Sequence, residues 1–366
     1  MKYLIKDNDK NPAYLQLYLL LRDGIINKIY PYKSKLPSKR ILAVESGVST
    51  ITVEHAYDLL IEEGYVESRE RSGYFVLFFL DDGFASNSND DVNKVVSIKH
   101  ASFNTNEKFP FSVFTKTMRK VITIYGEKIL DKSPNTGSIE LKEAIKCYLA
   151  RSKGIDVDIE QIIIGSGSEY LYGLITKLFN KSSIYAIEDP SYQQIEHIYQ
   201  LANIHFEKLK LGNDGIESTA LKNTKANILH ITPYRSFPSG ISASNIKRHE
   251  YLLWACKDER YIIEDDFESE FSVSRKPTET LFSNTTCDNI LYINSFSKTI
   301  SPSIRVAYML LPKHLIKTFN RELGYYSCTV PTYIQYVITN LIVNGDFERH
   351  INRVRRKKRK EWMRIH

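Results

Sequence analysis

Apolar residues recur at helical spacing in the N-terminal part of the chain. Residues 12–29, PAYLQLYLLLRDGIINKI, predict a helix that begins behind a proline suited to a first turn. Residues 38–46 and 50–63 predict two shorter helices on either side of Gly47. Residues 64–76, GYVESRERSGYFV, predict two short strands joined by a polar turn. This part of the chain is therefore expected to form helices followed by a hairpin.

From about residue 97 onward, short apolar segments alternate with helical ones. Such alternation implies crossover connections and a mostly parallel β-sheet, so we expect an α/β fold here. In sheets of this kind, ligands bind beyond the carboxyl ends of the strands. The expected strands are residues 161–165, 183–188, 227–232, 261–266, 290–296 and 307–312.

A segment without periodicity separates these two parts. Residues 81–95, DDGFASNSNDDVNKV, are polar and acidic, and they predict a flexible linker. The 366 residues of the chain also exceed the usual length of one domain. We therefore expect an N-terminal domain at residues 1–78, a linker at 79–97 and a C-terminal domain at 98–366.

The composition is that of an ordinary globular protein, with 42% hydrophobic and 25% charged residues. No apolar run is long enough for a transmembrane helix, and the N-terminus lacks the apolar core of a signal peptide, so we expect a cytoplasmic protein without a membrane partner. The net charge of +7 comes from residues 349–366, where nine Lys/Arg against one Glu give a local +8 and leave the remainder near −1. We interpret this segment as the solvated positive face of a helix, with contact to DNA as the alternative.

The cysteines and histidines do not suggest a metal site. Cys147, Cys256, Cys287 and Cys328 lie far apart without a CxxC pair, and the nine histidines form no HExxH motif. We therefore expect no bound metal and no disulfide framework, with the thiols reduced and mostly buried.

The two short helices and the hairpin have the layout of a winged helix-turn-helix. In that motif the second helix enters the major groove of DNA, while its neighbour and the hairpin hold phosphates. Ser49, Thr50 and Thr52 lie at the start of the second helix, where hydroxyls and free backbone N–H groups can face a duplex. Lys39 and Arg40 precede them in a basic cluster. A small helical domain with an incidental hairpin is the alternative.

This stretch resembles the winged helix-turn-helix of the GntR family of regulators. The resemblance implies binding to a double-stranded DNA operator, with Arg40 contacting phosphate and Ser72 and Gly73 closing the wing. Thr50 and Glu54 depart from the family pattern, because arginine is usual or frequent at these positions. We therefore expect weaker binding per monomer or another DNA sequence. The resemblance rests on LPS at 36–38, Arg40, GVS at 47–49, Thr52, Val53, Ala56, Tyr57, Glu63, Gly64, Ser72 and Gly73.

Polar residues follow the expected strands of the C-terminal part. GSGSEYL at 165–171 opens a helix, so the backbone of Gly167 and Ser168 can form an anion pocket. Asp265 comes at the end of another strand, where a helix cap or a surface acid is the alternative. These two signals are weak when each is taken alone.

The segment NSFSKTISPSIR, residues 294–305, adds a lysine flanked by phosphate-binding residue types. Ser295, Ser297 and Arg305 can hold a phosphate through hydroxyl and guanidinium donors. Lys298 can provide an amine that attacks an aldehyde. With an anion pocket, a strand-end carboxylate and an aromatic residue, these are the parts of a pyridoxal 5′-phosphate site.

The C-terminal part resembles the fold type I aminotransferases, and its combination with the N-terminal domain resembles the MocR subfamily of GntR regulators. The resemblance implies pyridoxal 5′-phosphate as cofactor and a homodimer. It also implies that Lys298 bonds covalently to the cofactor, that Asp265 pairs with its ring nitrogen and that Tyr192 stacks on its ring. The phosphate would be held by Gly167, Ser168, Ser295, Ser297 and Arg305. The motifs are GSG at 165–167, EDP at 188–190, FPSG at 237–240, EDD at 264–266 and SFSKT at 295–299.

Four departures from the aminotransferase pattern bear on function. Phe267 replaces a tyrosine, Glu169 replaces a glutamine and residues 234–236 replace Ser-His-Gln. The chain also stops at His366, so we expect a truncated domain without the small C-terminal subdomain and its substrate-binding arginine, which leaves turnover open. The leading hypothesis is a transcriptional regulator that senses pyridoxal 5′-phosphate or its amine or amino-acid adduct. The alternatives are an aminotransferase with a residual DNA-binding domain and an inactive truncated fragment.

Overall fold

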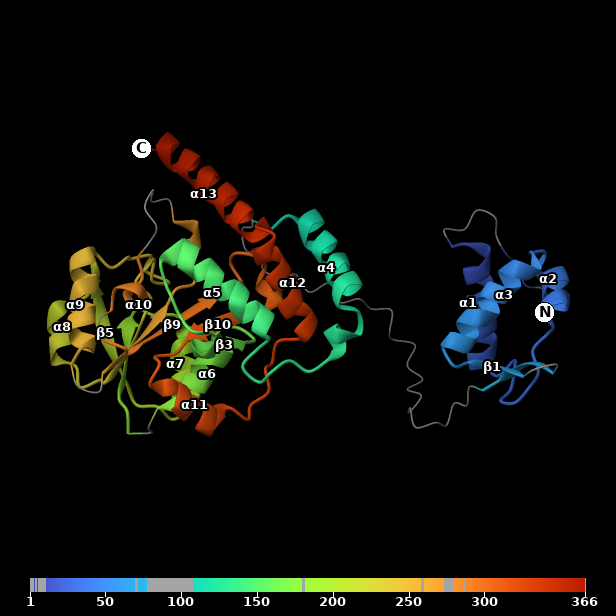
Figure 1. Cartoon of the computed structure of the whole chain (residues 1–366), viewed down its shortest axis with the longest axis horizontal. Helices are drawn as coiled ribbons and strands as arrows, with labels where there is room; N and C mark the ends of the chain where they lie inside the picture. Colours follow the sequence, from blue (N-terminus) through green and yellow to red (C-terminus); the bar gives the residue numbers. More distant parts are fainter. Residues whose placement is uncertain are drawn as a thin grey trace. The chain divides into compact units, whose positions relative to one another are not determined.

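The chain divides by its contacts into two compact units, Met1–Ala101 and Ser102–His366. A computed structural model describes residues 3, 5, 11–69, 72–77, 108–179, 182–257, 260–272, 279–285 and 287–365 (Figure 1). The linker expected at residues 79–97 lies outside the described residues.

The N-terminal unit has the three helices and the hairpin that the sequence predicts. Ser38 and Ser49 cap the second and third helices by accepting hydrogen bonds from backbone N–H groups. Gly47 ends the second helix at φ 69°, a left-handed conformation that favours glycine. Leu17, Tyr57 and other apolar side chains from all three helices form one core. The elements are α1 (Ala13–Ile26), α2 (Lys39–Ser46), α3 (Thr50–Glu62) and the antiparallel pair β1 (Val66–Arg69) and β2 (Gly73–Val76).

The C-terminal unit is built on an eight-stranded mixed sheet with the order β3-β10-β9-β8-β7-β4-β5-β6. Neighbours from β9 through β8, β7 and β4 to β5 are parallel, whereas β10 runs antiparallel to both β3 and β9, and β6 runs antiparallel to β5. The mostly parallel α/β sheet is therefore confirmed. The strands are β3 (Ile162–Gly165), β4 (Tyr185–Asp189), β5 (Phe206–Gly212), β6 (Gly215–Ile216), β7 (Ile228–Ile231), β8 (Tyr261–Asp265), β9 (Ile290–Ser295) and β10 (Ala307–Leu310).

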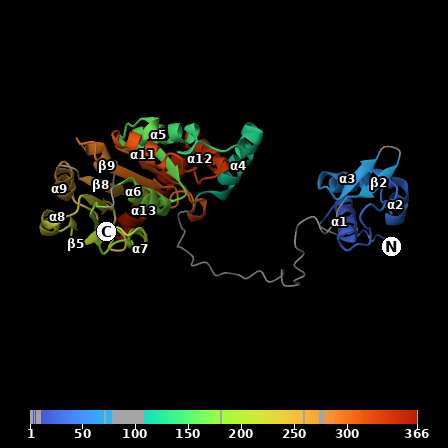
Figure 2. The same cartoon turned by 90° about the horizontal axis from the view of Figure 1, so that it is seen from below.

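Helices cover both faces of this sheet (Figures 1 and 2). Apolar side chains of α4, α5, α12 and α13 pack on one face, and those of α8, α9 and α10 continue this layer. Side chains of α6, α7 and α11 pack on the opposite face. The helices are α4 (Phe111–Tyr125), α5 (Ile139–Lys153), α6 (Ser168–Leu178), α7 (Gln193–Leu201), α8 (Ser218–Asn223), α9 (Asn245–Ala255), α10 (Leu281–Asn284), α11 (Leu315–Leu323), α12 (Thr332–Val343) and α13 (Asp346–Ile365). Short 3-10 turns are η1 (Gly126–Leu130), η2 (Ile159–Gln161), η3 (Ser269–Phe271) and η4 (Pro302–Ile304).

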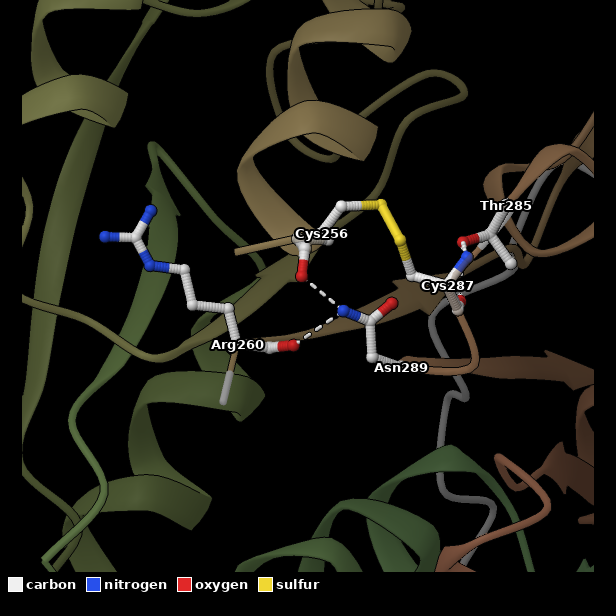
Figure 3. The surroundings of a disulfide bond; sticks show 6 residues. Cys256, Arg260, Thr285, Cys287 and Asn289 are labelled. Atoms are coloured by element: carbon white, nitrogen blue, oxygen red, sulfur yellow. Dashed lines mark hydrogen bonds between the residues drawn. A yellow bond between two sulfur atoms is a disulfide. The ribbon is translucent and has the colours of Figure 1, made fainter. Parts of the chain in front are cut away.

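A disulfide corrects one expectation from the sequence. Cys256, after α9, is bonded to Cys287, before β9, with 5.7 Å between their Cα atoms (Figure 3). Asn289 lies beside this bond and donates to the backbone carbonyls of Ala255 and Arg260. The expectation of four reduced cysteines was wrong, because the sequence spacing does not show that parallel strands bring these two segments together.

The long basic helix α13 covers most of the segment that carries the excess positive charge. Phe347, Ile351 and Val354 are buried on its apolar side. Arg349, Arg353 and other cations are exposed on its remaining surface. Among the residues that the structure describes, no helix is both long enough and apolar enough to cross a membrane.

Candidate cofactor pocket and nucleic-acid interface

Three strands of the sheet end at the same cavity. β8 ends at Asp265 and β9 at Ser295, and these strands are parallel neighbours. β3 ends at Gly165, before the helix α6. The cavity has a volume of about 280 Å³. Its lining consists of Ser168, Glu169, Tyr172, Tyr192, Thr232, Phe237, Asp265, Phe267, Ser295, Ser297, Lys298, Pro302 and Arg305.

The carboxylate of Asp265 lines the cavity and is buried. Its Oδ2 atom accepts a hydrogen bond from the Tyr172 hydroxyl, and it lies 3.9 Å from Nε2 of His230. Its Oδ1 atom is buried and has no hydrogen-bond partner among the described residues. Burial, reinforced by the charge of Asp265, raises the pKa of Tyr172 well above its ordinary value, so this tyrosine keeps its proton and donates. One oxygen of Asp265 is thus held by protein, while the other can accept a hydrogen bond from a ligand.

The lining of the cavity also combines a helix N-terminus with a guanidinium. Gly167 precedes α6 at φ 102°, and a Cβ atom built there would lie 2.6 Å from an Nη atom of Arg305. Only glycine leaves room for this close approach. Ser168 begins α6, and Ser295 and Ser297 add hydroxyl donors to the same cavity. Helix N–H groups, hydroxyls and a guanidinium are the donors that bind phosphate oxygens.

Lys298 and the aromatic rings of Tyr192, Phe237 and Phe267 also line the cavity. The lysine side chain is exposed, and its Nζ atom lies 5.7 Å from the ring centroid of Phe267. Tyr192, which follows β4, meets Phe237 edge-on with 6.0 Å between ring centroids. The cavity therefore combines a primary amine, aromatic surfaces, a buried acid and anion donors.

Every residue that the sequence assigned to a cofactor lies at this cavity. All of them line it except Gly167, which directly precedes the lining residue Ser168. Sequence reasoning missed Tyr172, although its spacing of four residues from Ser168 places both on one face of α6. It also missed Thr232 and Phe237, which belong to a motif that the sequence does show. No sequence signal indicated the ion pair between Glu169 and Arg305, whose atoms Oε2 and Nη2 are 2.5 Å apart.

A second carboxyl group is buried behind the cavity wall. Glu188 of β4 accepts hydrogen bonds from the Ser236 hydroxyl at 2.6 Å and from the Thr232 backbone N–H at 3.3 Å. Burial raises the pKa of Glu188 to about 8, although these two hydrogen bonds oppose the shift. This residue thus carries a proton at neutral pH and connects β4 to the segment that supplies Phe237.

In the N-terminal unit, the residues expected to contact DNA lie around the second and third helices and the hairpin. Arg40, Ser49, Thr50 and Ser72 are exposed, and Lys39, Thr52 and Gly73 are half-buried. The Ser49 hydroxyl accepts from the Thr52 backbone N–H at 3.1 Å, so this serine caps α3. All of these residues are thus at least partly exposed at the surface of the N-terminal unit.

Glu54 is one of the two departures from the family pattern, and it changes the charge of this surface. Its carboxylate forms an ion pair with Lys39 of α2, so a position where arginine is frequent holds an acid that neutralises a neighbouring cation. Arg40 is exposed on α2 and keeps its charge available at the surface. The positive charge on this face is therefore lower than the number of cations suggests.

Comparisons with known proteins agree with this division into two units. Residues 13–76 match the family model "Bacterial regulatory proteins, gntR family", and residues 102–364 match "Aminotransferase class I and II". The uncharacterized HTH-type transcriptional regulator YdeL of Bacillus subtilis is 31% identical over 96% of this chain and 77% of its own length. The probable rhizopine catabolism regulatory protein MocR of Rhizobium meliloti is 25% identical over 96% of this chain and 76% of its own length.

A solved structure shows the same fold in the C-terminal part. It is LysN, the α-aminoadipate aminotransferase of Thermus thermophilus, in complex with N-(5'-phosphopyridoxyl)-L-leucine. The match has a TM-score of 0.61 and 26% identity, and it covers 69% of this chain and 65% of the LysN chain. The present chain thus spans slightly less than two thirds of that enzyme.

The chain belongs to the helix-turn-helix regulators in which a GntR-type domain is joined to a domain of the class I and II aminotransferase family. Within this class its relatives place it in the MocR subfamily. The GntR-type domain implies binding to DNA. The resemblance inferred from the sequence is confirmed.

Proposed function

We propose that this protein is a DNA-binding transcriptional regulator whose C-terminal unit binds pyridoxal 5′-phosphate and responds to it or to its amine or amino-acid adduct. The observation that carries the proposal is one cavity that contains three matching groups. These are the Lys298 amine, the unpartnered buried oxygen of Asp265 and the anion donors around Arg305. These groups match the aldehyde, the ring nitrogen and the phosphate of this cofactor in chemical type.

The donor set accounts for each part of this cofactor. Pyridoxal 5′-phosphate supplies an electrophilic aldehyde and a ring that withdraws electrons. Lys298 provides the amine that bonds to the aldehyde. Oδ1 of Asp265 accepts a hydrogen bond from the ring nitrogen, and this contact satisfies an atom that is otherwise buried without a partner. Tyr192 covers one face of the ring.

The phosphate would lie where the donors converge. The Ser168 backbone N–H at the start of α6 has no partner within the helix, whereas the Gly167 N–H donates to the Gly165 carbonyl at 2.9 Å. Ser295 and Ser297 add hydroxyls. Arg305 contributes the guanidinium, which can bind phosphate through two parallel hydrogen bonds. The LysN structure contains a phosphopyridoxyl compound in the corresponding fold, which supports this assignment.

For DNA, we assign phosphate contact to Lys39 and Arg40, and groove or backbone contact to Ser49, Thr50 and Thr52 with Ser72 and Gly73 in the wing. Glu54 reduces the positive charge of this face by pairing with Lys39. A single unit should therefore bind weakly, and a homodimer would add a second half-site contact. Binding of a ligand in the C-terminal unit would then change how the two N-terminal units reach their half-sites.

Cofactor binding is tested by borohydride reduction. The full chain is incubated with pyridoxal 5′-phosphate, reduced and digested, and the peptide that contains Lys298 is examined by mass spectrometry. The expected result is a phosphopyridoxyl group on Lys298 and a visible absorbance that Lys298→Ala abolishes. Absence of the label from this lysine would remove the cofactor from the proposal.

DNA binding is tested with the DNA upstream of the gene for this protein. Arg40→Ala should weaken binding to all sequences and lower the slope of log affinity against log salt by about 1. Arg22→Ala is a matched control, because Arg22 lies on α1 and forms an ion pair with Asp23. Equal effects of both substitutions would contradict the assignment of Arg40.

Aminotransferase activity is the second candidate function, because the cavity contains both the amine of Lys298 and the acid of Asp265. Formation of a keto acid from an amino acid at enzyme-like rates, lost in Lys298→Ala, would favour it. Phe267 lies where the family pattern has a tyrosine, so its ring offers no hydroxyl to the cofactor. We therefore expect turnover to be slow or absent.

A further inference from the structure

Glu169 forms an ion pair with Arg305, the cation that the proposed phosphate site needs. It lies in the first turn of α6, and its Oε2 atom is 2.5 Å from Nη2 of Arg305. Both side chains line the cavity together with Ser295 and Ser297. A phosphate bound to Arg305 requires the same guanidinium N–H groups, so the carboxylate and the phosphate compete for one partner.

The charges that line the cavity make this competition important. Two cations, Lys298 and Arg305, and two acids, Asp265 and Glu169, are among its lining residues. Lys298 and Asp265 face the proposed aldehyde and ring nitrogen, so Arg305 is the cation left for the phosphate. With Glu169 paired to it, the phosphate end has no net side-chain charge. A neutral side chain at residue 169 would leave this end positive.

The backbone holds both partners in place. Arg305 has a φ of 47°, and Gly167 lets its guanidinium approach the start of α6. The helix N-terminus attracts negative charge, which favours the Glu169 carboxylate at the place where a phosphate would bind. The carboxylate therefore competes for the helix N-terminus as well as for the guanidinium.

The size of the effect follows from exposure. The side chains of Arg305 and Glu169 are 48% and 41% exposed, and ion pairs of this kind are weak. A phosphate can therefore displace the carboxylate, but it does so at a cost and then lies beside a second negative charge. We expect a moderate loss of affinity for the phosphorylated ligand and no exclusion of it.

We propose that Glu169 is a specificity-determining residue that weakens binding of phosphorylated aldehydes by pairing with Arg305. The inference rests on the proposed binding of pyridoxal 5′-phosphate and states how that site is adjusted in this chain. Occupancy of the site would then follow the concentration of free cofactor, as a sensor requires, because the cofactor is not held permanently. An unphosphorylated aldehyde would escape this penalty.

The test compares two ligands, pyridoxal 5′-phosphate and pyridoxal, which differ in the phosphate group. Each is titrated into the wild-type chain and into Glu169→Gln, and adduct formation is followed by absorbance and by borohydride labelling of Lys298. The substitution should lower the Kd for the phosphorylated aldehyde about tenfold, equal to about 1.4 kcal/mol, and leave the Kd for pyridoxal unchanged. Glu322→Gln is the matched control, because Glu322 is an exposed acid paired with Arg321 on α11.

A double-mutant cycle with Arg305→Gln identifies the route of the effect. If Glu169 acts mainly by occupying Arg305, Glu169→Gln should raise the affinity for pyridoxal 5′-phosphate much less once Arg305 is replaced than in the wild-type background. An equal gain in affinity in both backgrounds would show that Glu169 does not act through Arg305. Glu169→Ala provides a second variant, with circular dichroism as the check that each protein is folded.

The outcomes separate this inference from the proposed function. If the wild-type chain labels Lys298 and Glu169→Gln alters both ligands equally or neither, the specificity role is wrong and the cofactor site stands. If no variant forms an adduct with either aldehyde, the proposed site fails and the inference fails with it. A selective gain for the phosphorylated ligand supports both.

Discussion

Replacing Lys153 with methionine should destabilise the C-terminal unit strongly. Lys153 is the last residue of α5, and its side chain is 5% exposed. Its Nζ atom lies 2.7 Å from Oδ2 of Asp266 and 3.3 Å from Oε1 of Glu270, and it also donates to the Ser269 hydroxyl. Methionine is close in length and removes the charge, so Lys153→Met leaves two buried carboxylates without their cation.

The expected magnitude is about 3–5 kcal/mol, which is the usual cost of breaking a buried ion pair by removing one partner. Burial favours a raised pKa for Asp266, but the charge and hydrogen bond of Lys153 outweigh it and lower that pKa. Burial raises the pKa of Glu270, and Lys153 opposes the shift. Without Lys153 both carboxyl groups are more strongly protonated in the folded state than in the unfolded one. The variant should therefore lose stability relative to wild type as the pH rises above the unfolded values near 4.

Urea unfolding followed by tryptophan fluorescence measures this difference. The chain has two tryptophans, Trp254 and Trp362, and both belong to the C-terminal unit, so the signal reports that unit. Lys313→Met is the control, because Lys313 pairs with Asp158 at 2.9 Å while the side chains are 66% and 61% exposed. This control should leave the unfolding free energy nearly unchanged, because an ion pair between exposed side chains is screened by solvent. Equal losses of unfolding free energy in the two variants would refute the reasoning. So would a difference between wild type and Lys153→Met that becomes smaller as the pH rises.

Three further predictions concern a buried acid, a glycine and the disulfide. The pKa of Glu188 is raised to about 8, so between pH 5 and 8 the folded chain holds a proton that the unfolded chain has released. Wild type therefore loses stability as the pH rises in this range, whereas Glu188→Gln does not. Urea titrations should show that the variant gains up to about 1.4 kcal/mol of unfolding free energy over wild type per pH unit. Gly167→Ala places a Cβ atom against Arg305 at φ 102°, so spectral titration should show at least about a tenfold loss of affinity for pyridoxal 5′-phosphate. The bond between Cys256 and Cys287 closes a 31-residue separation, and dithiothreitol should lower the unfolding free energy of the oxidised chain by about 3–4 kcal/mol, with no effect on Cys256→Ser.

The sequence predicts the central strands of the sheet well because they are buried on both faces. All positions of β7 and β9 are buried, and most of them are apolar, so each strand stands out as a short, mainly apolar segment. β5 was missed, because FEKLKLG alternates charged and apolar residues, with only Leu209 fully buried. That pattern reflects its place next to the edge strand β6, where one side of the sheet meets solvent.

The candidate site was predictable where it depends on strand ends and not where it depends on pairing. Asp265 and Ser295 end two strands, so the rule for parallel sheets predicts from the sequence that they lie at one edge of the sheet. The ion pair of Glu169 and Arg305 joins residues 136 positions apart, and no local pattern indicates it. Lys153 and Asp266, which form a buried ion pair, are also far apart in the sequence. A lysine at the end of a helix usually indicates a solvated surface, so the sequence did not predict this ion pair.

The error about the cysteines follows from the same parallel register that made the site predictable. β8 and β9 pair in parallel, with Ile262 opposite Ile290 and Asp265 opposite Ile293. Their carboxyl ends therefore meet at the cavity, and their amino ends meet at the opposite edge of the sheet. Cys256 and Cys287 precede these amino ends, so the register brings them to a Cα separation of 5.7 Å, within the range that a disulfide needs. The strand-end rule that was applied to the polar residues, applied also to the residues before each strand, would have identified this pair.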